Sequence, residues 1–359
     1  MARSGGRWKH ANPCPGTGGP DPGPIPGEQG AEHGLGREGR LVSQLRITVE
    51  SWDPTYGSPI LDPATEPSDV AVDVAVELPP ADWRPLRAAP GTAPARRVIF
   101  VDGVRRIDAL VWIGEPGEAA RRGICASFAA GIVEASERAR VERLRVRRGL
   151  FSAVGPDPLA TRAGMFEPMA VVGDDLEQLS LGLQQRLGEL EIEVATSLES
   201  EADLIVVDGP LSGRQQVPGA VGYVKTHRVA YLPESLSPVV GRLAPGERTP
   251  LFLGTTSWTR YSWYLRLPGP VSHPWSGIVR LEATGNLRVS EASQLADLSA
   301  ATLPAYASVP HKDPRAPQNL FPIAGLEREL RHRLGDPAFV QRALRLAAAH
   351  PESDRRLAR

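Results

Sequence analysis

Cysteine is scarce in this sequence: only Cys14 and Cys125 occur among 359 residues. Cys14 lies in a stretch dominated by glycine and proline, and neither cysteine has the spacing to a second one that metal sites use. These facts exclude a framework of disulfide bonds and a cysteine-based zinc centre.

Long apolar runs and an imbalance of charge are also missing. No run reaches the roughly 20 apolar residues of a membrane-spanning helix, and the N-terminus lacks the apolar core of a secretion signal. The 41 basic and 42 acidic residues leave a formal net charge of −1, so a polyanion would have to be held by a local basic patch or through metal ions. The sequence predicts a cytoplasmic protein without a membrane partner.

Composition divides the chain into two parts. Residues 1–42 are rich in glycine and proline and offer little apolar surface for burial, which predicts a disordered tail. The hydrophobic content of 41% is sufficient for a core, and we expect one domain over residues 43–350. Within it, valine alternating with alanine or acidic residues over 70–78 predicts a half-buried strand.

Residues 97–114, RVIFVDGVRRIDALVWIG, are rich in strand-forming side chains and carry Asp102-Gly103 near the start. Because Asp-Gly is a common hairpin turn, we interpret this stretch as two strands joined by a tight turn. Residues 123–135, GICASFAAGIVEA, then predict a third strand of an antiparallel meander. The basic segment that follows has only a weak pattern.

From Asp174 the apolar residues recur at spacings of three and four, which predicts an amphipathic helix. Asp174 followed by Glu177 is typical of a capping box at its start. The helix leads into LIVVD, residues 204–208, which predicts a strand that ends at Asp208. Further strands are expected over 220–284, and two helices over 319–334 and 337–350. The apolar stripe of the first helix consists of Leu176, Leu179, Leu183, Leu187, Leu190, Val194 and Leu198.

This order of elements is that of the first part of a ribonuclease H-like fold. We therefore predict an α/β protein: a ribonuclease H-like mixed sheet with flanking helices and inserted strand and loop segments, its core at about residues 97–335. The first and fourth strands of such a sheet lie side by side, which would bring Asp102 close to Asp208. On the intervening helix Glu191 borders the apolar stripe, whereas Glu189 and Glu193 point away, so Glu191 is the first choice for a third acid and Glu193 the second.

Three carboxylates in one place repel each other unless hard divalent cations bind them. Two Mg²⁺ or Mn²⁺ ions about 3.5–4 Å apart are a common device for hydrolysing phosphodiesters. The pattern therefore predicts a centre of two such ions held by Asp102, Glu191 and Asp208. The alternatives are an ordinary solvated helix acid at Glu191 and purely structural turns at the two Asp-Gly pairs.

Three motifs, FVDGVRR, ADLIVVDGPL and GAVGYVKTH, resemble in order and spacing those of the NurA family of DNA-end-processing nucleases. The resemblance covers about residues 97–334 and rests mostly on the last two motifs. It implies a ribonuclease H-like nuclease of double-strand-break repair that uses Mn²⁺ or Mg²⁺, degrades DNA from 5′ to 3′ and cuts single strands internally. It also implies a homodimer docked on the hexameric HerA translocase, metal ligands at Asp102, Glu191 and Asp208, and a catalytic role for Lys225.

The sequence departs from the family pattern at two places. Val104 replaces the serine that usually follows the first Asp-Gly, and Phe321-Pro322 replaces a Tyr-Pro that precedes a histidine ligand. His332 is our candidate for that ligand, and a solvated helix or loop charge is the alternative for every candidate. The fourth ligand stays open among Glu327, Glu329, His332 and His311.

Two further stretches suggest contacts to nucleic acid. Arginines are dense over 138–148, where phosphate binding and a solvated charged face are the two interpretations. The aromatic stretch 257–277 suits either stacking on single-stranded bases or a core or dimer interface; it holds Trp258, Tyr261, Trp263, Tyr264 and Trp275 near Arg260 and Arg266. The candidate substrate-binding residues are Arg105, Arg143, Arg145 and Arg147.

Two functions are compatible with these patterns. The first is a metal-dependent deoxyribonuclease acting with a HerA-like translocase. The second is a non-catalytic nucleic-acid-binding or scaffold protein of the same fold. The presence of both Asp102 and Asp208 favours the enzyme.

Overall fold

One mixed sheet with helices on both faces organises the part of the chain that the computed structural model describes, residues 70–114, 119–197, 202–227, 229–271 and 273–349. The predicted tail over 1–42 and the end of the apolar stripe at Leu198 lie outside these residues. The strands are β1 (Ala71–Asp73), β2 (Val98–Ile113), β3 (Arg121–Ala135), β4 (Ala139–Ser152), β5 (Leu159–Thr161), β6 (Gly164–Ala170), β7 (Leu204–Asp208), β8 (Ala220–Val224), β9 (Phe252–Thr255), β10 (Thr259–Arg266) and β11 (Ile278–Thr284). The helices are α1 (Leu176–Thr196), α2 (Ser237–Gly241), α3 (Val289–Thr302), α4 (Phe321–Arg333) and α5 (Pro337–Ala349).

The sheet has the strand order β1-β9-β10-β11-β8-β7-β2-β3-β4-β6-β5. Strands β2, β3 and β4 form an antiparallel meander, β7 pairs with β2 in parallel, and β8 pairs with β7 in parallel. Val101 of β2 lies opposite Val207 of β7. The predicted α/β class, with its mixed sheet, its flanking helices and its first and fourth strands side by side, is confirmed.

The expected turn at Asp102-Gly103 was wrong. Strand β2 continues through this dipeptide, and Asp102 lies opposite Gly131 of β3. Gly103 has another reason to be glycine: a Cβ at this position would lie 2.5 Å from Glu191 Oε1 and 2.7 Å from Leu187 Cδ1. The close approach of α1 to the strand therefore favours glycine at this position.

Two other local expectations need correction. The side chain that caps α1 is Asp175, not Asp174: its Oδ1 accepts a hydrogen bond from the backbone N–H of Gln178 at 2.8 Å. The strand expected over 70–78 extends only from Ala71 to Asp73, because Asp73 Oδ1 accepts the N–H of Ala75 and turns the chain out of the sheet. The basic segment without a clear pattern proved to be β4.

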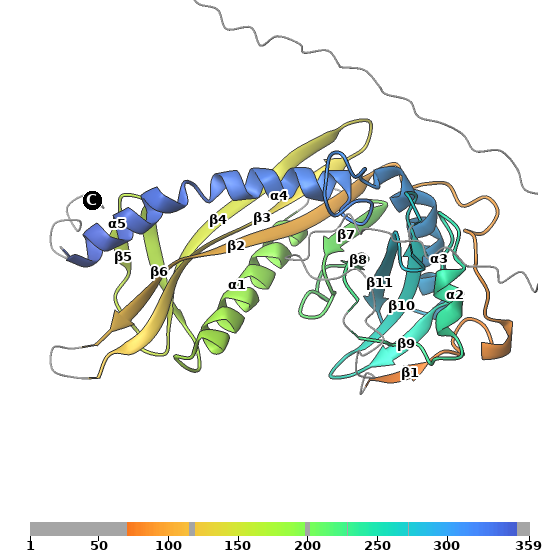
Figure 1. Cartoon of the computed structure of the whole chain (residues 1–359), viewed down its shortest axis with the longest axis horizontal. Coiled ribbons are helices and arrows are strands. Elements are labelled where there is room, and N and C mark those ends of the chain that lie inside the picture. The colour runs from red at the N-terminus through yellow and green to blue at the C-terminus, as the bar shows by residue number, and fades with distance from the viewer. Residues whose placement is uncertain (1–69, 115–118, 198–201, 228, 272, 350–359) are drawn as a thin grey trace, which may run out of the picture. The chain divides into compact units, whose positions relative to one another are not determined.

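Side chains alternate along β2 and so divide the core between the two faces of the sheet. Ile99 and Val101 pack against the leucine stripe of α1, whereas Val98 and Phe100 belong to the cluster that α3 and α4 cover. In Figure 1, α1 and α4 accordingly lie on opposite sides of the meander. The site described below lies where these two layers reach the ends of β7 and β8.

No helix in the described part of the chain is both long enough and apolar enough to cross a membrane.

Candidate active site

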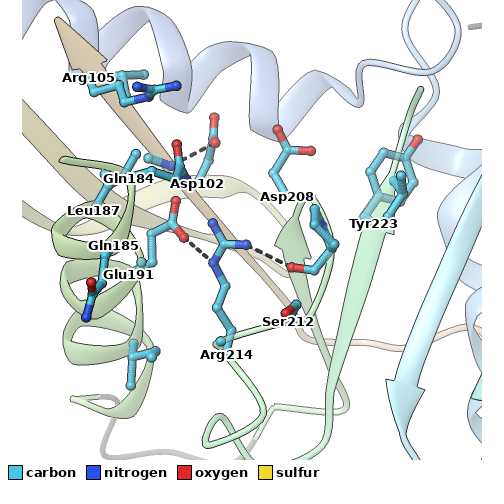
Figure 2. A pocket seen from close by; sticks show the side chains of 18 of the residues that line it. Asp102, Arg105, Gln184, Gln185, Leu187, Glu191, Asp208, Ser212, Arg214 and Tyr223 are labelled. Carbon is cyan, nitrogen blue, oxygen red and sulfur yellow. Dashed lines mark hydrogen bonds and ion pairs between the residues drawn. The ribbon is translucent and has the colours of Figure 1, made fainter. Parts of the chain in front are cut away.

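Acidic side chains from four elements line one cavity of about 1160 Å³. Four of them are Asp102 of β2, Glu191 of α1, Asp208 at the end of β7 and Glu327 of α4. The fifth, Glu189 of α1, is exposed and pairs with Arg186 at 2.8 Å. Asp102 and Glu191 are buried, with 6% and 3% of their surface exposed, and both nevertheless reach the cavity wall. Figure 2 shows the Asp102, Glu191 and Asp208 carboxylates around one opening.

Asp102 is held by a hydrogen bond from its own strand. Its Oδ1 accepts the N–H of Gly103 at 2.7 Å, which orients the carboxylate against its own strand. Burial, together with the nearby negative charge of Asp208, raises the pKa of Asp102 well above the ordinary value. Two carboxylates crowded in a low-dielectric site cannot both stay charged without cations to offset them.

Glu191 forms a buried ion pair with Arg214, whose guanidinium also donates to the carbonyl of Pro210 at 2.8 Å. Burial raises the pKa of Glu191 to about 7 although Arg214 lowers it, and Asp208 adds a further upward contribution. Figure 2 shows the Arg214 guanidinium between Glu191 and the loop that follows Asp208. In this way Arg214 ties the helical acid to the 209–214 loop.

Asp208 ends β7 and is followed by Gly209, whose φ of +94° suits glycine. Its Oδ2 accepts a hydrogen bond from Lys225 Nζ at 2.6 Å, whereas its Oδ1 is buried without a hydrogen-bond partner. Lys225 also donates to Asn319 Oδ1 at 3.0 Å, and Asn319 donates to Asp313 at 2.7 Å. The segment before α4 thus helps to position the lysine.

Of the four candidates for the fourth metal ligand, Glu327 is the one that lines the cavity. It pairs with Arg315 and, at 2.8 Å, with Arg331, and all three side chains line the cavity. His332 and Glu329 are not among the lining residues: His332 is exposed in the last turn of α4, and Glu329 pairs with Arg333 at 2.7 Å.

The remaining candidates lie outside the cavity wall. His311 is exposed in the loop before α4. Phe321, at the place of the family's tyrosine, lies under Lys312, whose Nζ is 5.4 Å from the ring centroid.

The arginines predicted to bind substrate fall into two groups. Arg105 lines the cavity. Arg143, Arg145 and Arg147 lie on β4 away from its wall, and Arg147 pairs with Glu193 of α1 at 2.5 Å. The fallback acid Glu193 is therefore engaged at the outer surface of the helix, while Glu191 lines the cavity.

The basic side chains that pair with the acids of the cavity were not identified from the sequence. Arg214 and Arg315 have no motif of their own, and the role of Asn319 depends on a segment about a hundred residues further along the chain than Asp208 and Lys225. Within the described residues, no three histidine, cysteine or acidic side chains stand in a ready-made metal arrangement. In this arrangement Arg214 pairs with Glu191 and Lys225 pairs with Asp208.

The donor chemistry nevertheless fits a hard divalent cation. All four acids offer carboxylate oxygen, the ligand that Mg²⁺ and Mn²⁺ prefer. The unpartnered Asp208 Oδ1 is a buried acceptor beside Asp102 that lacks a donor or cation. A cation bound between these two carboxylates would satisfy that oxygen and relieve their repulsion.

No protein-family model matches this chain, and no curated protein matches its sequence. Among solved structures, the crystal structure of the NurA nuclease from Sulfolobus solfataricus is similar, with 12% sequence identity and a TM-score of 0.41. The similarity covers 70% of this chain and 84% of that one. The roles that the three motifs suggest for individual residues stay predictions.

Proposed function

We propose that this protein is a metal-dependent deoxyribonuclease that hydrolyses phosphodiester bonds when DNA ends are processed. One observation carries the proposal: Asp102, Glu191, Asp208 and Glu327 reach the same cavity from four separate elements. Gathering buried acids in one place costs stability that bound cations can offset, and hydrolysis of a phosphate diester is a reaction that a pair of divalent cations catalyses.

The same residues suggest how the site works. Asp102, Asp208 and Glu191 would hold Mn²⁺ or Mg²⁺, with Glu327 as the fourth ligand in place of the histidine expected from the resemblance. When bound, two such cations supply an activated water and stabilise the leaving oxygen.

The chain's own cations act on the phosphate. Lys225 lies beside Asp208 and can offset the charge that develops on the phosphate oxygens. Arg105, Arg315 and Arg331 line the same cavity, where they can bind the flanking phosphates. Gly209 leaves space next to Asp208 for the substrate backbone.

The finer properties come from the resemblance of the motifs. They are degradation from 5′ to 3′, internal cleavage of single strands, a homodimer, and docking on a HerA-like hexameric translocase. Acceleration of DNA degradation by such a translocase, measured with the purified proteins and ATP, tests the partnership.

The primary test compares the wild type with Asp102→Asn and, as the matched control, Asp174→Asn. Asp174 pairs with Arg121 at 3.2 Å on the surface and does not line the cavity. With labelled single- and double-stranded DNA and Mn²⁺, we expect the wild type and the control to cleave until a chelator is added. We expect Asp102→Asn to be slower by about 10²–10³-fold. Absence of cleavage of every DNA form by the wild type, or equal rates in Asp102→Asn, contradicts the proposal.

A non-catalytic nucleic-acid-binding or scaffold role is the second candidate. It is favoured by the ion pairs of Arg214 with Glu191 and of Lys225 with Asp208, which neutralise two carboxylates without any metal ion. In that case DNA binding would be the same in the wild type and Asp102→Asn, and neither Mn²⁺ nor a chelator would change it.

A further inference from the structure

A second cavity of about 490 Å³ adjoins the acidic one, and Pro210, Ser212, Val224 and Thr226 line both. Its volume lies within the range of small-ligand sites, about 300–1,000 Å³. The charged side chains in its wall, apart from the neutral His227, are Arg260, Arg280 and Glu282, which leaves an excess of one positive charge. The cavity therefore suits an anionic group.

Arginine and aromatic side chains alternate in this wall. The Arg260 guanidinium lies 5.5 Å from the ring centroid of Trp258 and 5.4 Å from that of Tyr231. Arg280 lies 4.4 Å from the Tyr231 ring. Arg260 and Arg280 are both 6% exposed, so their orientations are fixed by packing. Flat aromatic and guanidinium surfaces of this kind are what unpaired bases stack on.

The structure separates Trp258 from the other aromatic residues of its stretch. Tyr261, Trp263 and Tyr264 are buried core residues. Trp275 packs on His227, with ring centroids 4.9 Å apart. Trp258 is only half-buried and lines the second cavity, so of these aromatic residues it is the one that a ligand in this cavity would contact.

Glu282 joins the two cavities. It pairs with both arginines, and its Oε2 also accepts the backbone N–H of Leu211 at 2.9 Å. Leu211 belongs to the loop that begins directly after Asp208. The same carboxylate thus fixes the arginines of the second cavity and the loop beside the acidic site.

We propose that this second cavity binds one nucleotide of a single DNA strand, next to the phosphodiester that the acidic site cleaves. The base stacks on Trp258, and the positive charge of Arg260 and Arg280 faces its phosphate. This inference rests on the proposed nuclease function for its choice of ligand. It adds a subsite that holds the strand when the acidic site is not reacting.

The test measures binding of a 3′-labelled oligo-dT strand by fluorescence anisotropy with EDTA present, so that no cleavage occurs. The proteins are the wild type, Trp258→Ala, Trp258→Phe and the matched control Trp112→Ala, whose tryptophan is 66% exposed on β2. We expect the Kd of Trp258→Ala to rise about 5- to 150-fold, the range for loss of one stacked base. Trp258→Phe and Trp112→Ala should bind as the wild type does.

An abasic strand separates stacking from phosphate contacts. We expect the wild type and Trp258→Ala to bind it equally, because no base is present to stack. Equal binding of oligo-dT by Trp258→Ala and Trp112→Ala overturns the proposal. A loss that is as large on the abasic strand also overturns it.

Trp258 also packs against neighbouring core residues, so a measurement on the wild type guards against misfolding of the variant. An oligonucleotide containing 5-iodouracil is cross-linked by light and the protein is digested with trypsin. Cross-links in peptides 249–260 or 229–242, which hold Trp258 and Tyr231, support the subsite. Cross-links confined to the arginine-rich peptides of β4 overturn it.

The subsite and the nuclease can fail separately. If the wild type cleaves DNA and Trp258→Ala binds the strand as the wild type does, the subsite proposal is contradicted and the nuclease proposal stands. If the wild type cleaves no DNA but Trp258→Ala binds the strand more weakly than the wild type, the subsite proposal stands and the nuclease proposal is contradicted.

Discussion

Lys225 and Asp208 form a one-sided pair: the ammonium lies 2.6 Å from Oδ2, and Oδ1 of the same carboxylate is buried without a partner. The lysine therefore satisfies half of the acid and leaves the other half available. Both side chains are largely buried, so removal of one leaves the other as a buried charge without its partner.

Lys225→Met keeps most of the aliphatic stem and removes the charge. Because Asp208 would lose its donor, we expect the free energy of unfolding in EDTA to fall by about 1–3 kcal/mol. The rate of DNA cleavage should fall as well. Urea unfolding and cleavage assays measure these two effects. The control is Lys312→Met, at an exposed lysine, and equal losses in both variants would rule out a special role for Lys225.

Mn²⁺ should stabilise the wild type against heat. A ligand at 100 times its Kd adds about 2.7 kcal/mol to the free energy of unfolding. Asp102→Asn should lose most of this gain, since it removes a ligand, while Asp174→Asn should keep it. The measurement is a thermal-unfolding series over Mn²⁺ concentration, and the same midpoint shift in all three proteins would place the cation elsewhere.

Gly222 of β8 lets the loop after Asp208 pass close to the sheet. An added Cβ would lie 2.8 Å from the backbone nitrogen of Leu211 and 3.1 Å from the carbonyl oxygen of Gly209. We expect Gly222→Ala to cost about 1–3 kcal/mol in the free energy of unfolding and to slow cleavage, because the backbone beside Asp208 must shift. In contrast, Gly325→Ala in α4 meets nothing within 4 Å and should stabilise the helix by up to about 1 kcal/mol. Chemical unfolding of both variants decides the matter.

His227 should make stability depend on pH. Burial lowers its pKa to about 4 from an ordinary value of 6.5, so the unfolded chain takes up the proton first as the pH falls. The contribution of neutral His227 to the free energy of unfolding is fully present above pH 6.5. It is lost as the pH falls toward 4, which lowers the free energy of unfolding by up to about 3 kcal/mol. The free energy of unfolding at several pH values should therefore decline more steeply in the wild type than in His227→Gln. Parallel curves for the two proteins would contradict this origin.

Arg105 and Arg145 should differ in their effect on DNA binding, because only Arg105 lines the acidic cavity. Arg105→Ala should reduce the salt dependence of binding by about one unit of slope, as expected for loss of one phosphate contact. Arg145→Ala should change the slope less. Titrations over a range of salt concentrations provide the comparison. A larger change of slope in Arg145→Ala than in Arg105→Ala would indicate that the DNA runs along β4 and not through the acidic cavity.

The fold was largely predictable from the sequence, since periodicity reports directly on burial. The leucine stripe of α1 and the apolar run of β7 follow from local residue spacing, and the burial of Glu191 follows from its place beside that stripe. The unbroken course of β2 could not be predicted, because Gly103 accommodates side chains of a helix that comes much later in the chain.

The charges around the acids were equally out of reach. Arg214 lies in a loop without a pattern, and its pairing with Glu191 depends on how that loop returns toward α1. The same holds for Glu327, which no spacing distinguished from Glu329 until the helix was placed. Such contacts are set by tertiary packing and leave no periodic signal.

The two aspartates occupy different positions in their strands. Asp102 sits inside a strand that is bonded to β3 through Gly131 and continues on both sides of it. Asp208 is the last residue of its strand and precedes a glycine and a proline. In the proposed metal centre, backbone adaptation to cations of different radius would therefore come from the Asp208 side, which would make tolerance of both Mn²⁺ and Mg²⁺ a property of the segment 209–214.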